Sequence, residues 1–188
     1  MSDEKLNVIG KPLRKVDAAA KVTGRTIFAD DVVLPQMLYA KILRSTRPYA
    51  RMVSINTTDA ETMDGVKAIL LGKELPITFG ILPVSQDEHT LAIDTVRYVG
   101  EPVLAVAAVD EETAEDAVRR IHIEYEDLRP VMSIADGVHP TDIPIQGYAE
   151  QGNIHKTISF EFGDTRAALD HADLVLDDTF FYQGNTHL

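Results

Sequence analysis

The stretch from Pro102 to Val109 is an apolar run of strand length, and it constrains the fold more than any other part of the sequence. A strand without alternating polar residues is typical of a sheet that is covered on both faces, or nearly so. Asp110 ends the run and is suited to cap a following helix. That helix would carry an apolar stripe at helical spacing, formed by Ala114, Ala117, Val118 and Ile121.

After this helix the periodicity changes from helical to a period of two. Apolar residues alternate with polar ones here, with Ile121, Ile123 and Tyr125 on one side and His122, Glu124 and Glu126 on the other. Such alternation predicts a strand with one face in water. The segment from Asp94 to Leu128 is therefore predicted to form strand, helix and strand in succession, as the best-formed folding unit of the chain.

Smaller patterns predict further elements before this unit. Met37 to Arg44 alternates well enough for a strand, and Val66 to Leu71 predicts another. Between them, Thr58 and Glu61 have the spacing of a capping box, and Gly65 stands where a helix should end.

The segment Val16 to Phe28 contains a β-branched run that Gly24 interrupts, which predicts a bulge or a close backbone approach at that glycine. The adjacent Asp30 and Asp31 would point to opposite sides of an extended chain, so a turn is expected there rather than a catalytic pair.

Proline and glycine positions indicate how the chain is divided. We expect an N-terminal arm at 1–15, an α+β domain at 16–130, a linker at 131–152 and the start of a second domain at 153–188. The last part would contain a strand at Asn153 to Phe162, a helix capped by Asp164 and reaching Ala172, and a strand at Leu174 to Tyr182. The chain looks cut after this strand.

Two places could meet a partner. The loop between Gly72 and Ile93 is apolar, with Phe79, Ile81, Leu82 and Val84, so it should dock on the core of the chain, on a partner subunit or at a ligand mouth. Arg97 and Tyr98 precede Gly100 and could contact an anion or a partner, or form a structural pair at a strand edge.

Composition excludes several classes of function. The net charge of -12 and pI near 4.8 disfavour nucleic acid and anionic membranes as partners. The sequence has no cysteine, which excludes disulfides, cysteine nucleophiles and thiolate-bound zinc or iron–sulfur clusters on this chain. No signal peptide precedes the first element and no apolar run approaches the ~20 residues of a membrane helix, so a cytoplasmic location is expected.

No catalytic motif is present. Phosphate loops, dinucleotide fingerprints, nucleophile elbows and zinc-binding His-Glu-x-x-His patterns are all missing. The histidines stand at 89, 122, 139, 155, 171 and 187, but their neighbours share no pattern, so no metal site is predicted. His122 is expected to be a solvated cross-strand neighbour. The residues alone predict an acidic α+β domain without catalytic, cofactor-binding or metal-binding residues of its own.

A series of short motifs resembles the opening of the large subunit of molybdenum hydroxylases, the xanthine dehydrogenase and aldehyde oxidase enzymes. It includes Gly10-Lys-Pro12, Lys21-Val-Thr-Gly24, Arg44-Ser45, Val96-Arg-Tyr-Val-Gly100-Glu-Pro102 and Glu126-Asp127-Leu128. The resemblance covers nearly the whole chain. Within the family, Phe79-Gly-Ile-Leu-Pro83, Asp94 to Asp110 and Gly163-Asp164 with Ala172-Asp173 most resemble the molybdopterin subunit of 4-hydroxybenzoyl-CoA reductase.

The resemblance implies an α/β hammerhead domain followed by the first strand-helix-strand elements of a molybdopterin-binding domain. Molybdenum-molybdopterin would be bound by the remainder of a longer large subunit, with iron–sulfur clusters and FAD on partner subunits. This chain would then be a fragment or a split-gene subunit, inactive and without cofactor when isolated. Its candidate interface with the remainder, the iron–sulfur subunit or the FAD subunit consists of Phe79, Ile81, Leu82, Val84, Arg97 and Tyr98.

The implied reaction is reductive removal of a phenolic hydroxyl from an aromatic acyl-CoA such as 4-hydroxybenzoyl-CoA. The alternative within the family is hydroxylation of a purine or an aldehyde. An alternative of another class is a stand-alone interaction or assembly module without catalysis, because the residues alone show no active site.

Overall fold

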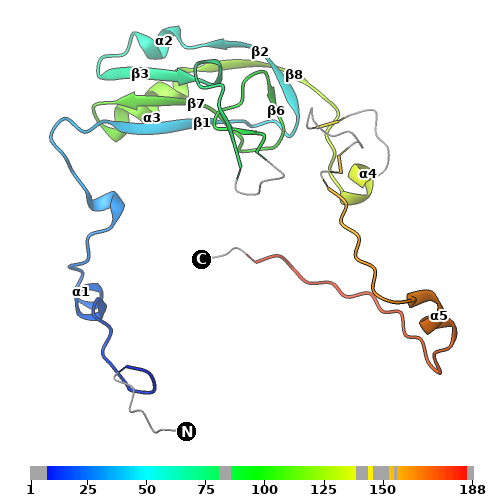
Figure 1. The fold of residues 1–188 in the computed structure, drawn as a ribbon. Helices are drawn as coiled ribbons and strands as arrows, with labels where there is room; N and C mark the ends of the chain where they lie inside the picture. The colour runs from blue at the N-terminus through cyan, green and yellow to red at the C-terminus, as the bar shows by residue number, and fades with distance from the viewer. Residues whose placement is uncertain (1–7, 81–85, 139–143, 146–152, 155, 186–188) are drawn as a thin grey trace. The chain divides into compact units, whose positions relative to one another are not determined.

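The computed structural model describes residues 8–80, 86–138, 144–145, 153–154 and 156–185 (Figure 1). The chain separates into two units, Met1–Pro130 and Val131–Leu188. The described part of the first unit forms two three-stranded sheets and a two-stranded hairpin, and the predicted central segment supplies strands to both of the three-stranded sheets.

The first sheet has β7 (Pro102–Ala108) at its centre, as the apolar run predicts. β1 (Tyr39–Arg44) and β3 (Val66–Leu71) pair with it on either side, both antiparallel. The second sheet has the order β6 (Thr95–Val96), β2 (Ala50–Asn56), β8 (His122–Asp127), again antiparallel. The predicted alternation of β8 is confirmed, because Ile123 and Tyr125 are half-buried while His122, Glu124 and Glu126 are exposed.

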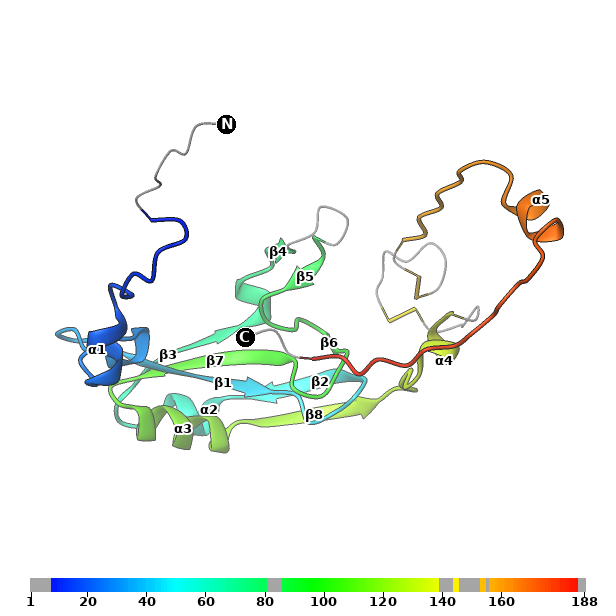
Figure 2. The ribbon, with the colours of Figure 1, turned by 90° about the horizontal axis from the view of Figure 1, so that it is seen from below.

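Helix α3 (Glu111–Arg120) connects the two sheets and lies on one face of the first (Figure 2). The predicted cap is confirmed: a side-chain oxygen of Asp110 accepts a hydrogen bond from the Thr113 amide at 2.7 Å. Glu111 and Glu112 occupy the first turn, and Arg119 and Arg120 the last, so the side-chain charges match the helix dipole at both ends. The strand-helix-strand prediction holds, but its two strands belong to different sheets.

The core has two parts that meet at β7. Leu104 and Val106 point toward the helices and pack with Ala60, Ala117 and Ile121. Val103 points the other way and packs with Ala50, Ala92 and Val96 of the second part. β7 therefore supplies fully buried side chains to both clusters, which explains why its sequence lacks alternating polar residues.

The start of the short helix α2 (Thr58–Glu61) differs from the predicted capping box of Thr58 and Glu61. The residue before the helix is Thr57, and its hydroxyl donates to the Glu61 carboxylate at 2.6 Å, while the Thr58 amide donates to the Asn56 side chain at 3.1 Å. The predicted N-cap, Thr58, lies one residue after the observed one, because the adjacent Thr57 and Thr58 have the same side chain. Gly65 was predicted to end this helix, but α2 ends at Glu61 with Thr62 as its C-cap. Gly65, with a φ of 90°, lies in the turn that leads into β3.

Gly24 ends a helix, and the predicted strand bulge at this position is wrong. Helix α1 (Ala18–Val22) precedes it, and Gly24 has a φ of 67°. The Arg25 amide donates to the Ala20 carbonyl at 2.8 Å, and the Gly24 amide to the Lys21 carbonyl at 3.2 Å. This pair of bonds is a Schellman motif, so the three alanines before the β-branched run decide the local structure.

Asp30 and Asp31 lie in the 3₁₀ turn η1 (Ala29–Asp31), as the predicted turn requires. The Asp31 carboxylate accepts the Phe28 amide at 2.9 Å. Its hydrogen bond is local, so the adjacent carboxylates do not form a shared site.

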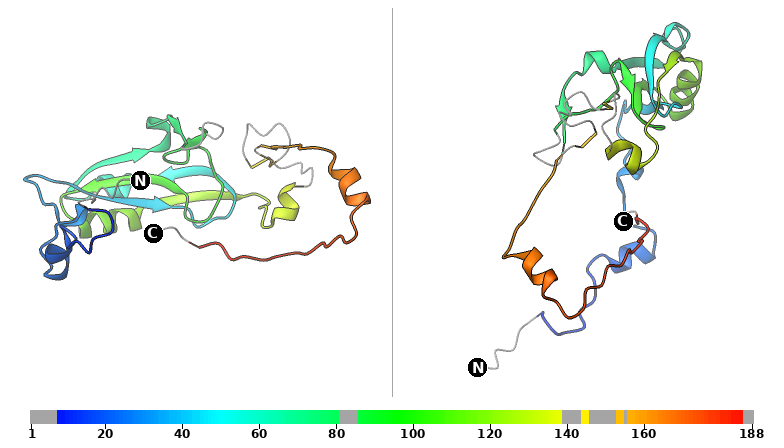
Figure 3. Two further views of the ribbon diagram at one scale, coloured as in Figure 1. Left: turned by 60° about the horizontal axis from the view of Figure 1, so that its bottom comes forward. Right: turned by 90° about the vertical axis from the view of Figure 1, so that its right-hand side faces the viewer.

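After β3, the 3₁₀ turn η2 (Gly72–Glu74) leads into a hairpin of β4 (Thr78–Phe79) and β5 (Glu88–His89), where the sequence predicted only a loop. The hairpin lies on the side of the first sheet opposite α2 and α3, as Figures 2 and 3 show. Gly72 makes a close approach possible, since a Cβ there would lie 2.3 Å from the Ala92 carbonyl oxygen. The predicted docking residues Ile81, Leu82 and Val84 lie outside the described residues.

In the second unit the described helices are α4 (Ile134–Val138) and α5 (Thr165–Asp170). The predicted cap of α5 is confirmed, because Asp164 accepts the Ala167 amide at 2.9 Å, although the helix ends at Asp170 rather than Ala172. The described parts of Asn153 to Phe162 and Leu174 to Tyr182 contain no strand, contrary to prediction. Most of their apolar residues are exposed, including Phe160 at 80% and Phe181 at 92%. A strand needs a hydrogen-bonded neighbour, and these described segments pair with no strand of this chain.

Candidate subunit interface

The turn between β6 and β7 contains the predicted partner residues Arg97 and Tyr98 and is held by a set of hydrogen bonds. The Glu101 amide donates to the Tyr98 carbonyl at 3.2 Å, which closes a four-residue turn. Gly100 occupies the third position with a φ of 94°, a conformation that strongly favours glycine. A Cβ on Gly100 would meet no heavy atom within 4 Å, so only the backbone angle demands glycine.

The end of β1 fixes this turn from the other side. The Gly100 amide donates to the Ser45 carbonyl, and the Ser45 amide to the Glu101 carbonyl, both at 2.8 Å. The Arg44 guanidinium donates to the Gly100 carbonyl at 2.9 Å. Three hydrogen bonds thus attach the turn to residues that lie more than fifty positions earlier in the chain.

Arg97 is an internal support of the turn. Its backbone amide donates to the Glu101 carboxylate, and its Nη1 lies 3.3 Å from the Glu101 Oε1. Glu101 is 7% exposed, and burial of a carboxylate is tolerated only when it is paired and hydrogen-bonded. Of the two residues predicted together, Arg97 is therefore committed to Glu101, and Tyr98 is left at the surface with 56% exposure.

Ser45 links this turn to the second sheet. It is 3% exposed, and its hydroxyl bonds both the backbone carbonyl and the amide of Arg47, at 2.9 and 3.0 Å. The Arg47 guanidinium lies 5.9 Å from the centre of the Tyr125 ring and 3.5 Å from the Asp127 carboxylate. Burial raises the pKa of Tyr125, while a hydrogen bond with Ser45 and the Arg47 charge act in the opposite direction.

A second surface is the outer face of the first sheet, the face turned away from α3. Away from the strand ends, the strand register places apolar residues on it: Ala40, Ile42, Ala68, Leu70, Ala105 and Ala107. Arg44 follows in the same alternation at the end of β1. Ile42 is 44% exposed and Leu70 38% exposed, although the hairpin lies on this side. Antiparallel sheets normally alternate polar residues on a solvated face, so a largely apolar face is typical of a covered one.

The sequence analysis predicted part of the turn between β6 and β7 as an interface, but not the outer face of the first sheet. Phe79 lies in the hairpin with 50% exposure, in a different element from Arg97 and Tyr98. Val99, at 63% exposure, was missed, although its place beside Gly100 in a short turn was a usable signal. The outer face was missed because it is assembled from three strands far apart in sequence.

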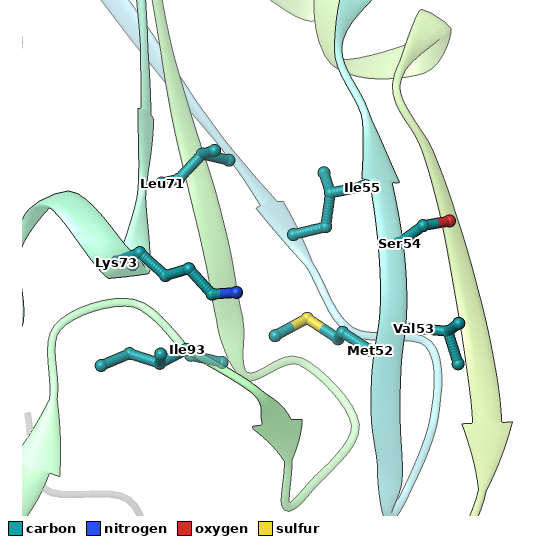
Figure 4. Close-up of a pocket in the computed structure, with 9 residues that line it drawn as sticks. Met52, Val53, Ser54, Ile55, Leu71, Lys73 and Ile93 are labelled. Atoms are coloured by element: carbon teal, nitrogen blue, oxygen red, sulfur yellow. The ribbon is translucent and has the colours of Figure 1, made fainter.

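A groove between the sheets offers little room for a substrate. Its volume is about 190 Å³, below the roughly 300 Å³ at which small-molecule sites begin. Met52 and Ile55 face Leu71 and Lys73 across it, while Val53 and Ser54 point to the other side of β2 (Figure 4). The Lys73 ammonium lies 3.6 Å from the Asp94 carboxylate, so the cation of the groove is already paired.

The described residues bring no three histidine or acidic side chains together in a way that could hold a metal ion. His122 is exposed opposite Asn56, as the sequence predicts for a cross-strand neighbour. Of the other histidines, His139, His155 and His187 lie outside the described residues. In the part of the chain that the structure describes, no helix has the length and apolar character to cross a membrane.

The paired antiparallel sheets and their connecting helix define an α+β hammerhead domain. Residues 23–129 match the family described as "Aldehyde oxidase and xanthine dehydrogenase, a/b hammerhead domain". The chain therefore belongs to this family, which consists of molybdenum hydroxylase oxidoreductases.

Named relatives extend the match beyond the hammerhead. The chain is 37% identical to the nicotinate dehydrogenase large molybdopterin subunit of Eubacterium barkeri, over 96% of its own length and 42% of the relative. It is 39% identical to a probable xanthine dehydrogenase subunit of Bacillus subtilis, over 92% of its own length and 23% of the relative. A solved Cu,Mo-CO dehydrogenase superposes with a TM-score of 0.72 at 25% identity, over 88% of this chain and 23% of the other. The chain thus spans less than half of each relative.

The described residues do not fit a molybdopterin or iron–sulfur site. The sequence lacks cysteine, and the groove is small and bordered by a lysine that is already paired.

Proposed function

We propose that this chain is the hammerhead region of the molybdopterin-binding subunit of a molybdenum-dependent oxidoreductase, where it acts as a docking scaffold rather than as a catalyst. The observation that carries the proposal is the outer face of the first sheet, where the central parts of three strands present apolar residues. A domain that worked alone would expose polar residues there.

The substrate we propose is a nitrogen heterocycle that undergoes hydroxylation. Two relatives are named for nicotinate and for xanthine, which supports this choice over reductive dehydroxylation of 4-hydroxybenzoyl-CoA. The hammerhead itself does not select the substrate, because a CO dehydrogenase shares the same region. Reductive dehydroxylation of 4-hydroxybenzoyl-CoA is the alternative reaction that the substrate assays compare with hydroxylation.

The division of labour follows from the same proposal. Residues 16–130 form the scaffold, 1–15 an arm, 131–152 a linker, and 153–188 the start of the molybdopterin-binding domain. Molybdenum-molybdopterin is bound by the remainder of the large subunit, and iron–sulfur clusters and FAD by partner subunits in the cytoplasm. Both of these relatives are named as single subunits of a dehydrogenase, which supports an assembly of several polypeptides.

The experiment is metal and flavin analysis of the natural complex, purified through this polypeptide, followed by assays with nicotinate, xanthine and 4-hydroxybenzoyl-CoA. We expect molybdenum and iron in the complex, and oxidation of a heterocycle with an added electron acceptor. A complex without molybdenum and iron would support the assembly module instead. If 4-hydroxybenzoyl-CoA is the only one of the three substrates that reacts, and it reacts with an added reductant, the heterocycle assignment is refuted.

A further inference from the structure

The second unit, Val131–Leu188, has no apolar core among its described residues. Every buried apolar residue of the described chain lies in the first unit, between Ala50 and Ile121. In the second unit the described residues are exposed or half-buried, although many of them are large and apolar. A unit without buried apolar surface cannot offset the conformational entropy lost on folding, so its folded form needs apolar residues from elsewhere.

Two extended segments carry most of the exposed large apolar residues of the described second unit. Residues 156–162, named segment A, precede α5 in the chain, and residues 174–182, named segment B, follow it (Figure 1). In segment A, Ile158, Phe160 and Phe162 alternate with the polar Ser159 and Glu161. Alternate side chains of an extended chain point to the same side, so segment A has one apolar side and one polar side.

Segment B carries apolar residues on both sides of the chain. Asp177 and Asp178 separate its two ends, and each end consists largely of apolar residues. All six of the large apolar residues are exposed: Leu174, Val175, Leu176, Phe180, Phe181 and Tyr182. Because consecutive residues of a strand point to opposite faces, a strand with this sequence needs cover on both faces at each end.

The backbone of both segments is also unpaired within the part of the chain that the structure describes. No backbone hydrogen bond among the described residues involves 156–162 or 174–182. In the first unit, by contrast, β7 is paired along both of its edges. An unpaired extended segment presents a row of amides and carbonyls that a neighbouring strand can complete. Unpaired backbone and exposed apolar side chains therefore coincide in the same two segments.

The relatives indicate which polypeptide supplies the missing strands. The match to the Eubacterium barkeri subunit covers 96% of this chain, so it extends past Pro130 into the second unit. In that relative and in the Bacillus subtilis one, the matched region and a larger remainder belong to one polypeptide, since the match covers 42% and 23% of their lengths. Segments of the same polypeptide meet at a high effective concentration, which favours the remainder of the same subunit over another molecule.

We propose that segments A and B are strands that pair with the remainder of the molybdopterin-binding subunit, outside residues 1–188, and complete a sheet of its molybdopterin-binding domain. Ile158, Phe160 and Phe162 enter the core beneath that sheet, while the side of Ser159 and Glu161 faces water. The inference rests on the proposed function for the identity of the subunit, but the two segments and their apolar sides belong to this chain.

Amide hydrogen exchange tests the pairing on two proteins, the full-length large subunit separated from its partner subunits and the 188-residue polypeptide. The amides of both segments should exchange about a hundredfold more slowly in the large subunit, because the strand hydrogen bonds must open before exchange. Equally fast exchange in both proteins would overturn the inference. Protection that disappears when the partner subunits are removed would also overturn it, since a second polypeptide would then cover the segments.

The 188-residue polypeptide distinguishes two other occupants. Protection of the segments that grows with protein concentration, together with dimers in analytical ultracentrifugation, would show that two copies pair with each other. Protection that is independent of concentration would show that the 188 residues cover the segments themselves. Either result contradicts pairing with the remainder of the subunit.

Phe160→Asp and Ser159→Asp form a matched pair of variants, because they place the same charge on opposite sides of segment A. In the full-length large subunit, Phe160→Asp should lower the melting temperature by several degrees or prevent folding, since it buries an unpaired charge, and Ser159→Asp should not. In the 188-residue polypeptide, both variants should leave unfolding of the first unit unchanged. Equal effects of the two variants in the large subunit would mean that segment A has no buried side, which overturns the inference.

Metal analysis separates this inference from the proposed function. If the natural complex contains molybdenum and iron but the segments exchange as fast as in the 188-residue polypeptide, the pairing inference fails and the function stands. If the complex lacks both metals and the segments are still protected within the longer subunit, the pairing inference stands and the function fails.

Discussion

The Arg97 Nη1 lies 3.3 Å from the Glu101 Oε1, and this ion pair supports a turn whose exposed side chains are Tyr98 and Val99. The side chains of the pair are 25% and 10% exposed, in contrast to the surface pair of Arg51 and Glu126, at 58% and 52%. The two pairs differ mainly in burial, and so they provide a matched comparison.

Glu101→Ala should lower the free energy of unfolding by about 3 kcal/mol, because it leaves the Arg97 guanidinium largely buried without its partner. Glu126→Ala should change it by less than about 1 kcal/mol, since exposed ion pairs contribute little. Urea denaturation of the two variants measures both values. Equal effects would contradict the structural role given to Arg97.

Val106→Asp should unfold the first unit. Val106 is fully buried in the central strand, and an unpaired charge there costs more than about 4 kcal/mol. Circular dichroism of the purified variant would show loss of the folded signal. The control Val53→Asp places the same charge at a position that is 56% exposed and should remain folded.

Gly65→Ala should destabilise the chain more than Gly100→Ala. Both glycines have positive φ, at 90° and 94°, which costs an L-residue about 1–2 kcal/mol. Only at Gly65 would the new Cβ also meet a neighbour, 2.9 Å from the Val109 Cγ2. Thermal unfolding measures the difference, and adding Val109→Ala to Gly65→Ala should recover part of the loss. No recovery would show that the contact is unimportant.

The cap of α3 should make stability depend on pH. Hydrogen bonds from Thr113 hold the pKa of Asp110 below its ordinary value of 3.8. A lowered folded-state pKa means that the stabilisation is fully present above the ordinary value and is lost as the pH falls through the folded-state pKa. Asp110→Ala should therefore be less stable than the wild type at neutral pH, and the difference should shrink in acid. A difference that is constant with pH would rule out the ionised cap.

His122→Ala should change neither folding nor the activity of the complex to a measurable extent, because His122 is exposed on the polar face of β8. Steady-state assays of the full complex measure the effect. A large loss of kcat would assign His122 a role in chemistry.

Local patterns predicted the local structure well. The spacing of apolar residues and the Asp110 cap were sufficient for β7, α3 and β8, because each depends on neighbours within a few positions. The assignment of β7 and β8 to separate sheets depends on pairing with β1, β2 and β3, and periodicity carries no information about such partners.

The errors have identifiable physical causes. At Gly24 the preceding alanines favour a helix, and the glycine closes it. At Phe160 and Phe181 the alternating pattern is present, but the described chain provides no neighbouring strand. Val99 was missed because its exposure depends on the turn between β6 and β7, although its place beside Gly100 was a usable signal.

The most direct test of the scaffold assignment is the molybdenum and iron content of the natural complex purified through this polypeptide. Both metals should co-purify with it in fixed proportion to the protein. A homogeneous complex that contains neither metal would contradict the assignment to a molybdenum-dependent oxidoreductase.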